Sequence, residues 1–131
     1  MIQLWPAKTA LLLEDEALIA LDVAEVLEEA GFEVVEMISS CSAAEIWLED
    51  NTPDIAVIDP RLRDGYCDGV AEILSSRSVP FIIYSGEPRR TDDSKSIFLK
   101  GNWVTKPAEN SKLLSAVRLF VWLHEGSVSL Q

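Results

Sequence analysis

Five short apolar segments alternate with segments of helical periodicity along almost the whole chain. The apolar segments cover residues 9–13, 32–38, 54–59, 80–85 and 102–106. The helical segments cover residues 16–30, 68–77 and 108–126, with one more from Ser42 to about Asp50. Strands that alternate with helices pair in parallel, and the helices cover both faces of the sheet. The sequence therefore predicts one α/β domain over residues 1–131, with its core between about residues 9 and 124.

Local signals mark the ends of two of these helices. The first helix has an apolar stripe followed by Gly31, which is typical of a helix C-terminus. The stripe consists of Ile19, Val23, Val26, Leu27 and Ala30. Ser42 and Glu45 have the spacing of a capping box and predict the start of the second helix. Residues 86–100 are polar, so we expect any helix there to be short and loosely held.

Polar side chains follow four of the predicted strands, at the point where each strand ends. Glu14 and Asp15 follow the first strand, and Asp59 ends the third. Ser85 ends the fourth strand and Lys106 the fifth. Each has an ordinary explanation when taken singly, such as a helix cap or a solvated loop. Together they indicate a site, because parallel α/β sheets bind ligands at the carboxyl ends of their strands.

These residues resemble the motifs of the receiver domain of two-component response regulators. The resemblance covers about residues 9–122 and rests on Glu14-Asp15, Asp59, Ser85 and Lys106-Pro107. The intervals of 44, 26 and 21 residues from Asp15 through Asp59 and Ser85 to Lys106 are similar to those of the family. The resemblance implies a doubly wound, flavodoxin-like (CheY-like) sheet of five parallel strands in the order 2-1-3-4-5.

Clustered carboxylates repel one another and take up protons unless a cation joins them. Mg²⁺ suits such a cluster, because it is a hard ion that accepts carboxylate oxygens and keeps several waters. The resemblance implies that Asp15 and Asp59 are direct ligands and that Glu14 acts directly or through water. It also implies that the backbone carbonyl of Arg61 is the remaining protein ligand of the ion.

The resemblance makes Asp59 the phosphoacceptor, since a carboxylate can attack a phosphoryl group and form an acyl phosphate. Lys106 would neutralise charge on the transferring group, and the Ser85 hydroxyl would donate to a phosphoryl oxygen. Trp103 occupies the position of the family's switch aromatic. The Lys106-Pro107 bond is cis in the family, a form that X-Pro bonds adopt at modest cost.

The chain departs from the commonest family residues at several of these positions. Glu14 stands where Asp is more frequent, Ser85 where Thr is, and Trp103 where Tyr or Phe is. Arg61 and Arg63 occupy a loop in which smaller or polar residues are frequent. None of these changes removes the expected phosphorylation site.

Composition excludes several other functions. The net charge is −11, and the only basic residue among the first sixty is Lys8, so we expect no nucleic-acid binding. No apolar run approaches the roughly 20 residues that span a membrane. The N-terminus lacks the layout of a signal peptide. Cys41 and Cys67 have no metal-ligand spacing, and we expect reduced thiols in a cytoplasmic protein.

The expected partner is a histidine kinase or a histidine phosphotransfer protein. Leu18 and Leu21 lie outside the core stripe of the first helix and near the acid pair, which favours a docking surface there. The segment "VPFIIYSG" is similar to stand-alone receivers that accompany kinases of the HWE and HisKA-2 type. No output domain is expected after the last helix, so the downstream partner would be a separate protein. His124 is interpreted as a solvated residue near a helix C-terminus rather than a phosphotransfer histidine.

Two alternative functions remain open from the residues. The chain could be a pseudo-receiver, an interaction module that works without phosphorylation, although its complete set of acids and Lys106 favours a working site. It could also be a phosphatase of the haloacid-dehalogenase type, which would need a second Asp where Arg61 stands. A receiver would catalyse its own aspartyl phosphorylation and dephosphorylation without being a conventional turnover enzyme.

Overall fold

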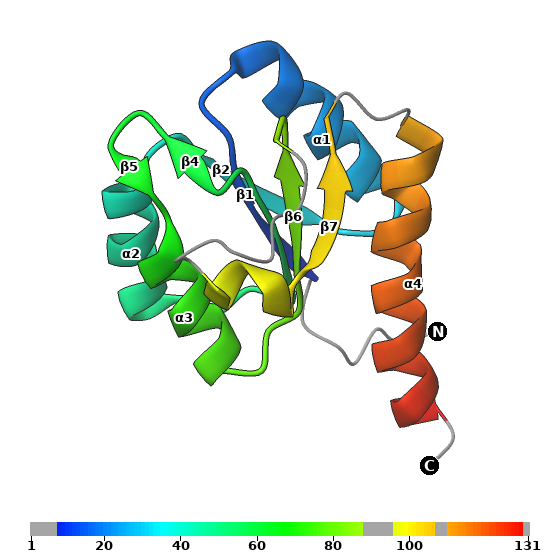
Figure 1. The fold of residues 1–131 in the computed structure, drawn as a ribbon. Coiled ribbons are helices and arrows are strands. Elements are labelled where there is room, and N and C mark those ends of the chain that lie inside the picture. The colour runs from blue at the N-terminus through cyan, green and yellow to red at the C-terminus, as the bar shows by residue number, and fades with distance from the viewer. Residues whose placement is uncertain (1–7, 88–95, 107–109, 130–131) are drawn as a thin grey trace.

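The chain forms a five-stranded parallel sheet with helices on both faces, as the computed structural model shows (Figure 1). The structure describes residues 8–87, 96–106 and 110–129. In chain order the elements are β1 (Thr9–Leu13), α1 (Ala17–Glu29), β2 (Val34–Ile38), α2 (Cys41–Asp50), β3 (Ile55–Ile58), β4 (Arg61–Leu62), β5 (Gly65–Tyr66), α3 (Asp68–Ser76), β6 (Phe81–Ser85), the 3₁₀ helix η1 (Ser96–Lys100), β7 (Asn102–Thr105) and α4 (Asn110–Ser129).

The strand order confirms the predicted topology. The sheet runs β2-β1-β3-β6-β7, and all four pairings are parallel. Counted within this sheet alone, the order is the expected 2-1-3-4-5. The short strands β4 and β5 form a separate antiparallel hairpin. This hairpin lies in residues 60–67, which the sequence predicts to be a loop. The order reverses between β1 and β3, which places the expected ligand crevice at their carboxyl ends.

Two apolar cores lie on opposite faces of the sheet, because successive side chains of a strand point to opposite sides. Leu11 and Leu13 of β1 join the core under α2, α3 and η1. Ala10 and Leu12 join the core under α1 and α4. Each fully buried leucine contributes roughly 1.5–3 kcal/mol to folding. Residues 10–13 of β1 are buried on both faces of the sheet and are all apolar, so polar side chains begin again only after the strand ends.

Helix α1 matches its prediction closely. Val23, Val26 and Leu27 of the predicted stripe are buried, and Ile19 and Ala30 are partly buried against the same core. Gly31 has a φ of +107°, a conformation that residues with a side chain rarely adopt. The expected stop after Ala30 is therefore confirmed.

The predicted capping box of α2 is wrong. The N-cap is Ser40, whose side chain accepts a hydrogen bond from the Ala43 N–H at 3.2 Å, so the helix starts before Ser42. The first free N–H groups of α2 are taken instead by the Asp64 carboxylate, which accepts from Cys41 at 2.9 Å and from Ser42 at 3.0 Å. A distant side chain thus replaces the local capping partner that the sequence favours.

The polar segment 86–100 contains one described helical element, the five-residue 3₁₀ helix η1. Phe98 is buried in the core beside α3, and Ile97 packs against the same core. Residues 88–95 lie outside the described part of the chain. Within the described residues, none of the helices has the combination of length and apolarity that crossing a membrane requires.

Candidate functional site

The carboxyl ends of β1 and β3 bring two acidic residues together. The strand register pairs Leu13 with Ile58, and the Asp59 N–H donates to the Leu13 carbonyl at 2.9 Å. Glu14 and Asp59 are the next residues of the two strands, so their carboxylates emerge at the same edge of the sheet. They are separated by 45 positions in sequence, and only the parallel pairing makes them neighbours.

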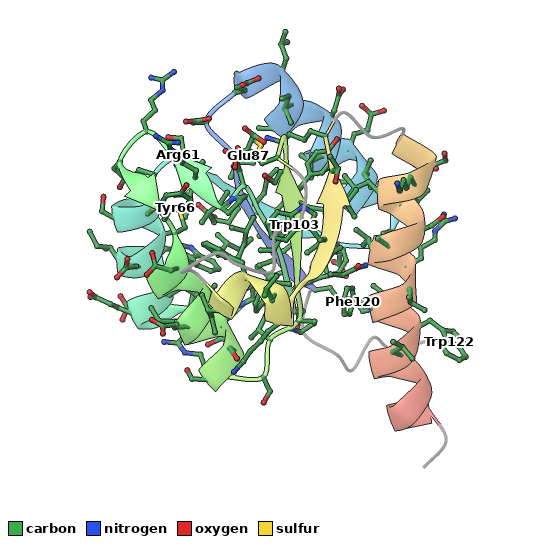
Figure 2. All side chains as sticks on the ribbon, in the orientation of Figure 1. Arg61, Tyr66, Glu87, Trp103, Phe120 and Trp122 are labelled. Atoms are coloured by element: carbon green, nitrogen blue, oxygen red, sulfur yellow. A yellow bond between two sulfur atoms is a disulfide. The ribbon has the colours of Figure 1, made fainter. Side chains whose placement is uncertain are left out.

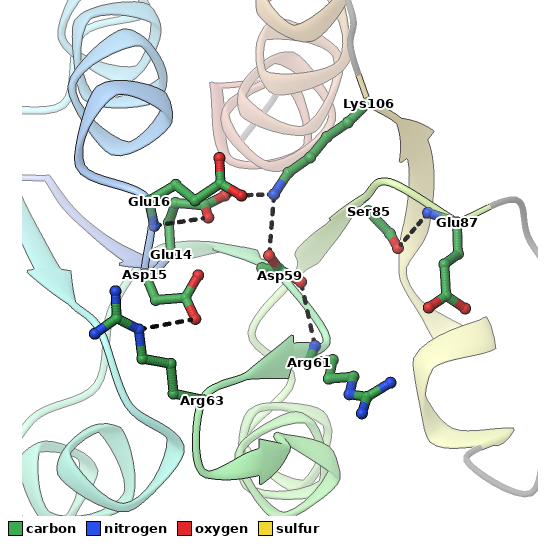
Figure 3. Close-up of polar contacts among 9 residues, drawn as sticks. All are labelled: Glu14, Asp15, Glu16, Asp59, Arg61, Arg63, Ser85, Glu87 and Lys106. Carbon is green, nitrogen blue, oxygen red and sulfur yellow. Dashed lines mark hydrogen bonds and ion pairs between the residues drawn. The ribbon is translucent and has the colours of Figure 1, made fainter.

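The other half of the edge comes from β6 and β7. These strands pair in parallel up to Ser85 and Thr105, and the Lys106 N–H donates to the Ser85 carbonyl at 2.6 Å. This bond continues the sheet by one residue and places Lys106 at the same edge as the acids. Figure 3 shows its side chain reaching across the end of β6 towards β1 and β3.

The Lys106 ammonium bridges two carboxylates. It donates to Glu14 Oε1 at 2.6 Å and to Asp59 Oδ2 at 3.0 Å (Figure 3). The ammonium also lies 5.5 Å from the centre of the Tyr84 ring, a cation–π distance. Two anionic partners and an aromatic face hold the ammonium in place, so one positive charge is fixed beside the Asp59 carboxylate.

Burial shapes the protonation of this group of charges. Glu14 is only 6% exposed, and this burial raises the pKa of its carboxyl; the hydrogen bond and the charge of Lys106 offset the rise in part. Burial alone would lower the pKa of Lys106, but the hydrogen bonds and charges of Glu14 and Asp59 outweigh it and raise that pKa. Lys106 therefore keeps its charge at neutral pH, and that charge favours the ionised form of Glu14.

Glu14, Asp15 and Asp59 form a cluster of carboxylates that could hold a metal ion, because one oxygen from each lies within 4.8 Å of the others. The three ligands are all hard oxygen donors, which suit Mg²⁺ rather than a thiophilic metal. Asp15 also faces Arg63, whose Nε lies 4.0 Å from Asp15 Oδ2. The donor set fits a magnesium ion, which would add positive charge to three carboxylates that Lys106 and the more distant Arg63 neutralise only in part.

The hairpin β4–β5 places two arginines beside this cluster. The Arg61 N–H donates to Asp59 Oδ1 at 3.2 Å, which orients the carboxylate. The Arg61 guanidinium lies over the Tyr66 ring, 5.6 Å from its centre (Figure 2). Sequence reasoning missed this hairpin, although the Asp64-Gly65 pair is a turn signal and Gly65 has a φ of +118°.

Cys41 and Cys67 form a disulfide, so the expectation of reduced thiols is wrong. Cys41 is the first residue of α2, and Cys67 immediately precedes α3. These helices pack on the same face of the sheet, and the Asp64 carboxylate draws the hairpin onto the start of α2. The two Cα atoms thereby lie 5.1 Å apart despite a separation of 26 residues. Sequence spacing alone does not reveal such a pairing.

Ser85 and Trp103 both form hydrogen bonds with the main chain of Glu87, two residues after the end of β6. Ser85 is buried, and its Oγ accepts a hydrogen bond from the Glu87 N–H at 3.1 Å. The indole Nε1–H of Trp103 donates to the Glu87 carbonyl at 3.2 Å. Sequence reasoning did not single out Glu87, because its contribution comes from the main chain, which any residue type would supply.

Two expected features fall outside what the structure describes. Pro107, and with it the cis form of its peptide bond, lies outside the described residues. The described side chains of α4 end before His124, so the interpretation of that histidine also stays a prediction.

A 2-1-3-4-5 parallel sheet with an acidic cluster and a lysine at its carboxyl edge defines the CheY-like receiver class. Solved structures share the fold. The response regulator receiver domain protein from Methanospirillum hungatei JF-1 matches with a TM-score of 0.79 at 18% identity, over 93% of this chain and 99% of that one. SdrG from Sphingomonas melonis Fr1 matches with a TM-score of 0.71 at 28% identity, over 88% of this chain and 97% of that one.

A curated relative agrees with this class. The transcriptional regulatory protein PdtaR of Mycobacterium tuberculosis is 31% identical over 118 residues, which cover 87% of this chain and 57% of PdtaR. The chain thus spans a little over half the length of this relative. No protein-family model matches the chain. The chain therefore has the fold of the response regulator receiver domains, and its similarity to PdtaR agrees with that class.

Proposed function

We propose that the chain accepts a phosphoryl group on Asp59 from a histidine kinase or a histidine phosphotransfer protein, in a reaction that needs Mg²⁺. The observation that carries this proposal is the Lys106 ammonium, held 3.0 Å from Asp59 and 2.6 Å from Glu14 at the carboxyl edge of the sheet. A positive charge fixed beside a nucleophilic carboxylate stabilises charge that develops on transferring oxygens.

In this reaction a carboxylate oxygen of Asp59 attacks phosphorus as the bond from phosphorus to the donor's imidazole nitrogen breaks. The products are an aspartyl phosphate and a neutral histidine, once the imidazole nitrogen is protonated. Such transfers have a loose, in-line transition state, so positioning and charge do most of the catalysis. The Arg61 N–H, which donates to Asp59 Oδ1, contributes to that positioning. Slow attack of water on the same phosphorus would restore the carboxylate.

Glu14, Asp15 and Asp59 belong to the proposed Mg²⁺ site, together with the backbone carbonyl of Arg61. The first three are supported by their mutual distances of at most 4.8 Å. The bound ion would supply charge neutralisation to the arriving phosphoryl group. Burial raises the pKa of the Glu14 carboxyl, and a cation bound beside it would favour its ionised form.

Mg²⁺ should raise the thermal unfolding midpoint, because an ion that binds only the folded cluster stabilises that state. Replacing Asp15 with Asn should weaken Mg²⁺ binding by about tenfold or more, since it removes one of the three carboxylates. Unfolding measured along a Mg²⁺ titration gives both results. Asp22→Asn, at an exposed position of α1 outside the cluster, is the matched control. Equal Mg²⁺ dependence in the two variants would contradict the assignment of Asp15.

The face of α1 nearest this site is proposed to dock the phosphodonor. Leu18 is 80% exposed and Leu21 is 57% exposed, so neighbouring elements do not cover them. Acidic residues surround them on the exposed side of the helix, among them Glu16, Asp22 and Glu25. A partner helix with an apolar centre and a basic rim would complement this surface.

Replacing Leu18 with Asp should slow phosphotransfer from the cognate kinase by about tenfold, because it places a charge in the centre of the docking surface. Labelling by acetyl phosphate should stay unchanged, since a small donor needs no docking. Ile46→Asp on α2 is the control, because Ile46 is 65% exposed on the other face of the sheet. The docking assignment fails if Leu18→Asp slows both donors equally, or if Ile46→Asp slows the kinase as much.

Phosphorylation is proposed to signal through Ser85 and Trp103 to a separate downstream protein. A serine that turns to donate to the phosphoryl group vacates space beside β6, and an aromatic ring of β7 can respond. The similarity of "VPFIIYSG" to receivers paired with HWE and HisKA-2 kinases makes such a kinase the proposed donor. We also propose that the protein acts in the cytoplasm, where its kinase would present the phosphoryl group.

A further inference from the structure

The disulfide between Cys41 and Cys67 closes the loop that carries the proposed phosphoacceptor. This loop begins at Asp59, forms the hairpin β4–β5 and ends at Cys67, directly before α3. The Cys67 N–H donates to the Pro60 carbonyl at 2.9 Å, so the far end of the loop is bonded to the residue that follows Asp59. Through its sulfur, Cys67 is also bonded to the first residue of α2. The disulfide therefore fixes the loop relative to a helix that packs on the sheet.

Two weaker contacts hold the same loop on the N-terminal end of α2 (Figure 1). The Asp64 carboxylate at the hairpin turn accepts from the N–H groups of Cys41 and Ser42. Cys41 Sγ lies 3.4 Å from the Gly65 carbonyl oxygen, to which a thiol at that position can donate. Both contacts are compatible with reduced cysteines. We therefore expect a reduced chain to stay folded while its loop gains freedom.

The hairpin beside the disulfide is small enough to open locally. Both cysteines are buried, so a reductant reaches their sulfurs only when the neighbouring chain moves. Most of residues 61–66 are exposed, and Leu62 is the buried one among them. A two-stranded hairpin is marginally stable by itself in water, and such exposed elements open at a lower free energy than the whole domain. A small dithiol can therefore reach the disulfide without unfolding of the sheet.

We propose that Cys41 and Cys67 form a reversible thiol–disulfide site whose oxidised state prepares Asp59 for Mg²⁺ and for the phosphoryl group. This inference rests on the proposed function, which assigns Asp59 its role and places the protein in the cytoplasm. Disulfides of cytoplasmic proteins are usually transient, and catalysis or redox sensing is their usual role. The co-reactant of this site is a dithiol reductant.

The reduction is a balanced exchange of sulfur–sulfur bonds. A thiolate of the dithiol attacks one sulfur of the disulfide, forms a mixed disulfide and releases the other cysteine as a thiolate. The second thiol of the reductant then displaces the first cysteine. Two electrons and two protons pass to Cys41 and Cys67, and the dithiol leaves as a disulfide. The reverse exchange with an oxidised dithiol restores the closed loop.

The state of the disulfide should act on the metal site through the main chain. Asp59 and the Arg61 carbonyl are proposed ligands from this loop, and the Arg61 N–H orients Asp59. When the disulfide is closed, these groups are held before the ion arrives, whereas in the reduced chain part of the loop is ordered only on binding. Ordering the backbone of one residue should weaken Mg²⁺ binding about five- to thirtyfold. Phosphorylation at limiting Mg²⁺ should slow by a similar factor.

Mg²⁺ titrations of oxidised and of dithiothreitol-reduced wild-type protein test this inference. The backbone amide of Arg61 in a ¹H–¹⁵N spectrum reports ion binding, because that N–H donates to Asp59 Oδ1. Labelling by acetyl phosphate at limiting Mg²⁺ reports phosphoryl transfer, and alkylation followed by intact mass gives the state of the cysteines. Reduction should weaken Mg²⁺ binding and slow labelling by the factor given above. The variant with both Cys41→Ala and Cys67→Ala should match the reduced wild type and should not respond to dithiothreitol.

Four results would overturn the redox site and leave the phosphorylation site standing. The first is equal Mg²⁺ binding and labelling in the oxidised and reduced proteins. The second is a disulfide that dithiothreitol does not reduce in the folded protein, and the third is a reduced chain that unfolds at 25 °C. The fourth is an equal effect of dithiothreitol on the wild type and on the variant with two alanines. An Arg61 amide that ignores Mg²⁺ in both states would instead contradict the proposed function itself.

Discussion

Asp59→Asn should abolish phosphoryl incorporation completely, from a kinase and from acetyl phosphate alike. An amide oxygen is a far weaker nucleophile than a carboxylate, and among the described residues no other acid at this edge has the same contacts. Glu14 is buried against Lys106, and Asp15 faces Arg63. Intact mass after incubation with donor and Mg²⁺ gives the result. A variant that still gains one phosphoryl mass would place the acceptor elsewhere.

The same variant should remain folded, because Asn has nearly the same shape as Asp. Its amide oxygen can keep the hydrogen bond from the Arg61 N–H. Lys106 loses one ion pair but retains Glu14, and the negative charge of Asp59 that helps to raise the pKa of Glu14 is gone. We expect the free energy of unfolding without Mg²⁺ to change by no more than about 1 kcal/mol. Loss of labelling together with unfolding would not support the assignment.

Lys106→Met should have two large effects with a common origin. Removing the ammonium leaves Glu14 buried without a counter-charge, which should lower the free energy of unfolding by about 2–3 kcal/mol at neutral pH. It also removes the fixed positive charge beside Asp59, so phosphorylation should slow about a hundredfold or more. Denaturant unfolding and the rate of labelling by acetyl phosphate measure the two effects separately.

The pH dependence of stability distinguishes the loss of the Glu14 counter-charge from a general loss of packing in Lys106→Met. The pKa of Glu14 is raised in the folded protein, so between that pKa and the unfolded value near 4.5 the folded state binds more protons. Stability contributed by this group is therefore present at low pH and is lost as pH rises through the raised pKa. Without Lys106 that pKa should rise further, so the deficit of Lys106→Met should shrink on acidification. A deficit that is the same at pH 5 and pH 7 would contradict this explanation. Lys106→Arg, which keeps the charge in a different geometry, should recover stability better than rate.

Features that depend on repeated local patterns were predictable from the sequence. The five strands follow from buried apolar runs that alternate with amphipathic helices, and the resemblance to receiver domains implied their order. Gly31 marks the end of α1, where its φ favours glycine. The approach of Glu14, Asp59 and Lys106 to one another was also predictable, since carboxyl ends of parallel strands share an edge. The exposure of Leu18 follows from its position outside the stripe.

Features that depend on contacts between distant segments were not predictable. Asp64 replaces a local cap of α2 from across the hairpin, and the pairing of Cys41 with Cys67 needs the packing of two helices. The hydrogen bonds of Ser85 and Trp103 to Glu87 are invisible in a sequence because they use main-chain groups of Glu87. In each case the decisive partner lies many residues away or has no side-chain signature, so spacing and periodicity carry no information about it.

The central claim is that Asp59 becomes an aspartyl phosphate. Phosphorylation of Asp59 also distinguishes a phosphorylated receiver from a pseudo-receiver with the same fold. Borohydride reduces an acyl phosphate of aspartate to homoserine, which marks the acceptor permanently. Wild-type protein should be incubated with acetyl phosphate, with and without Mg²⁺, then reduced, digested and mapped by mass spectrometry. We predict homoserine at position 59 alone, and only when Mg²⁺ was present. Three results would contradict the account: homoserine at another position, equal conversion without Mg²⁺, or an Asp59 that stays unmodified after incubation with acetyl phosphate and Mg²⁺.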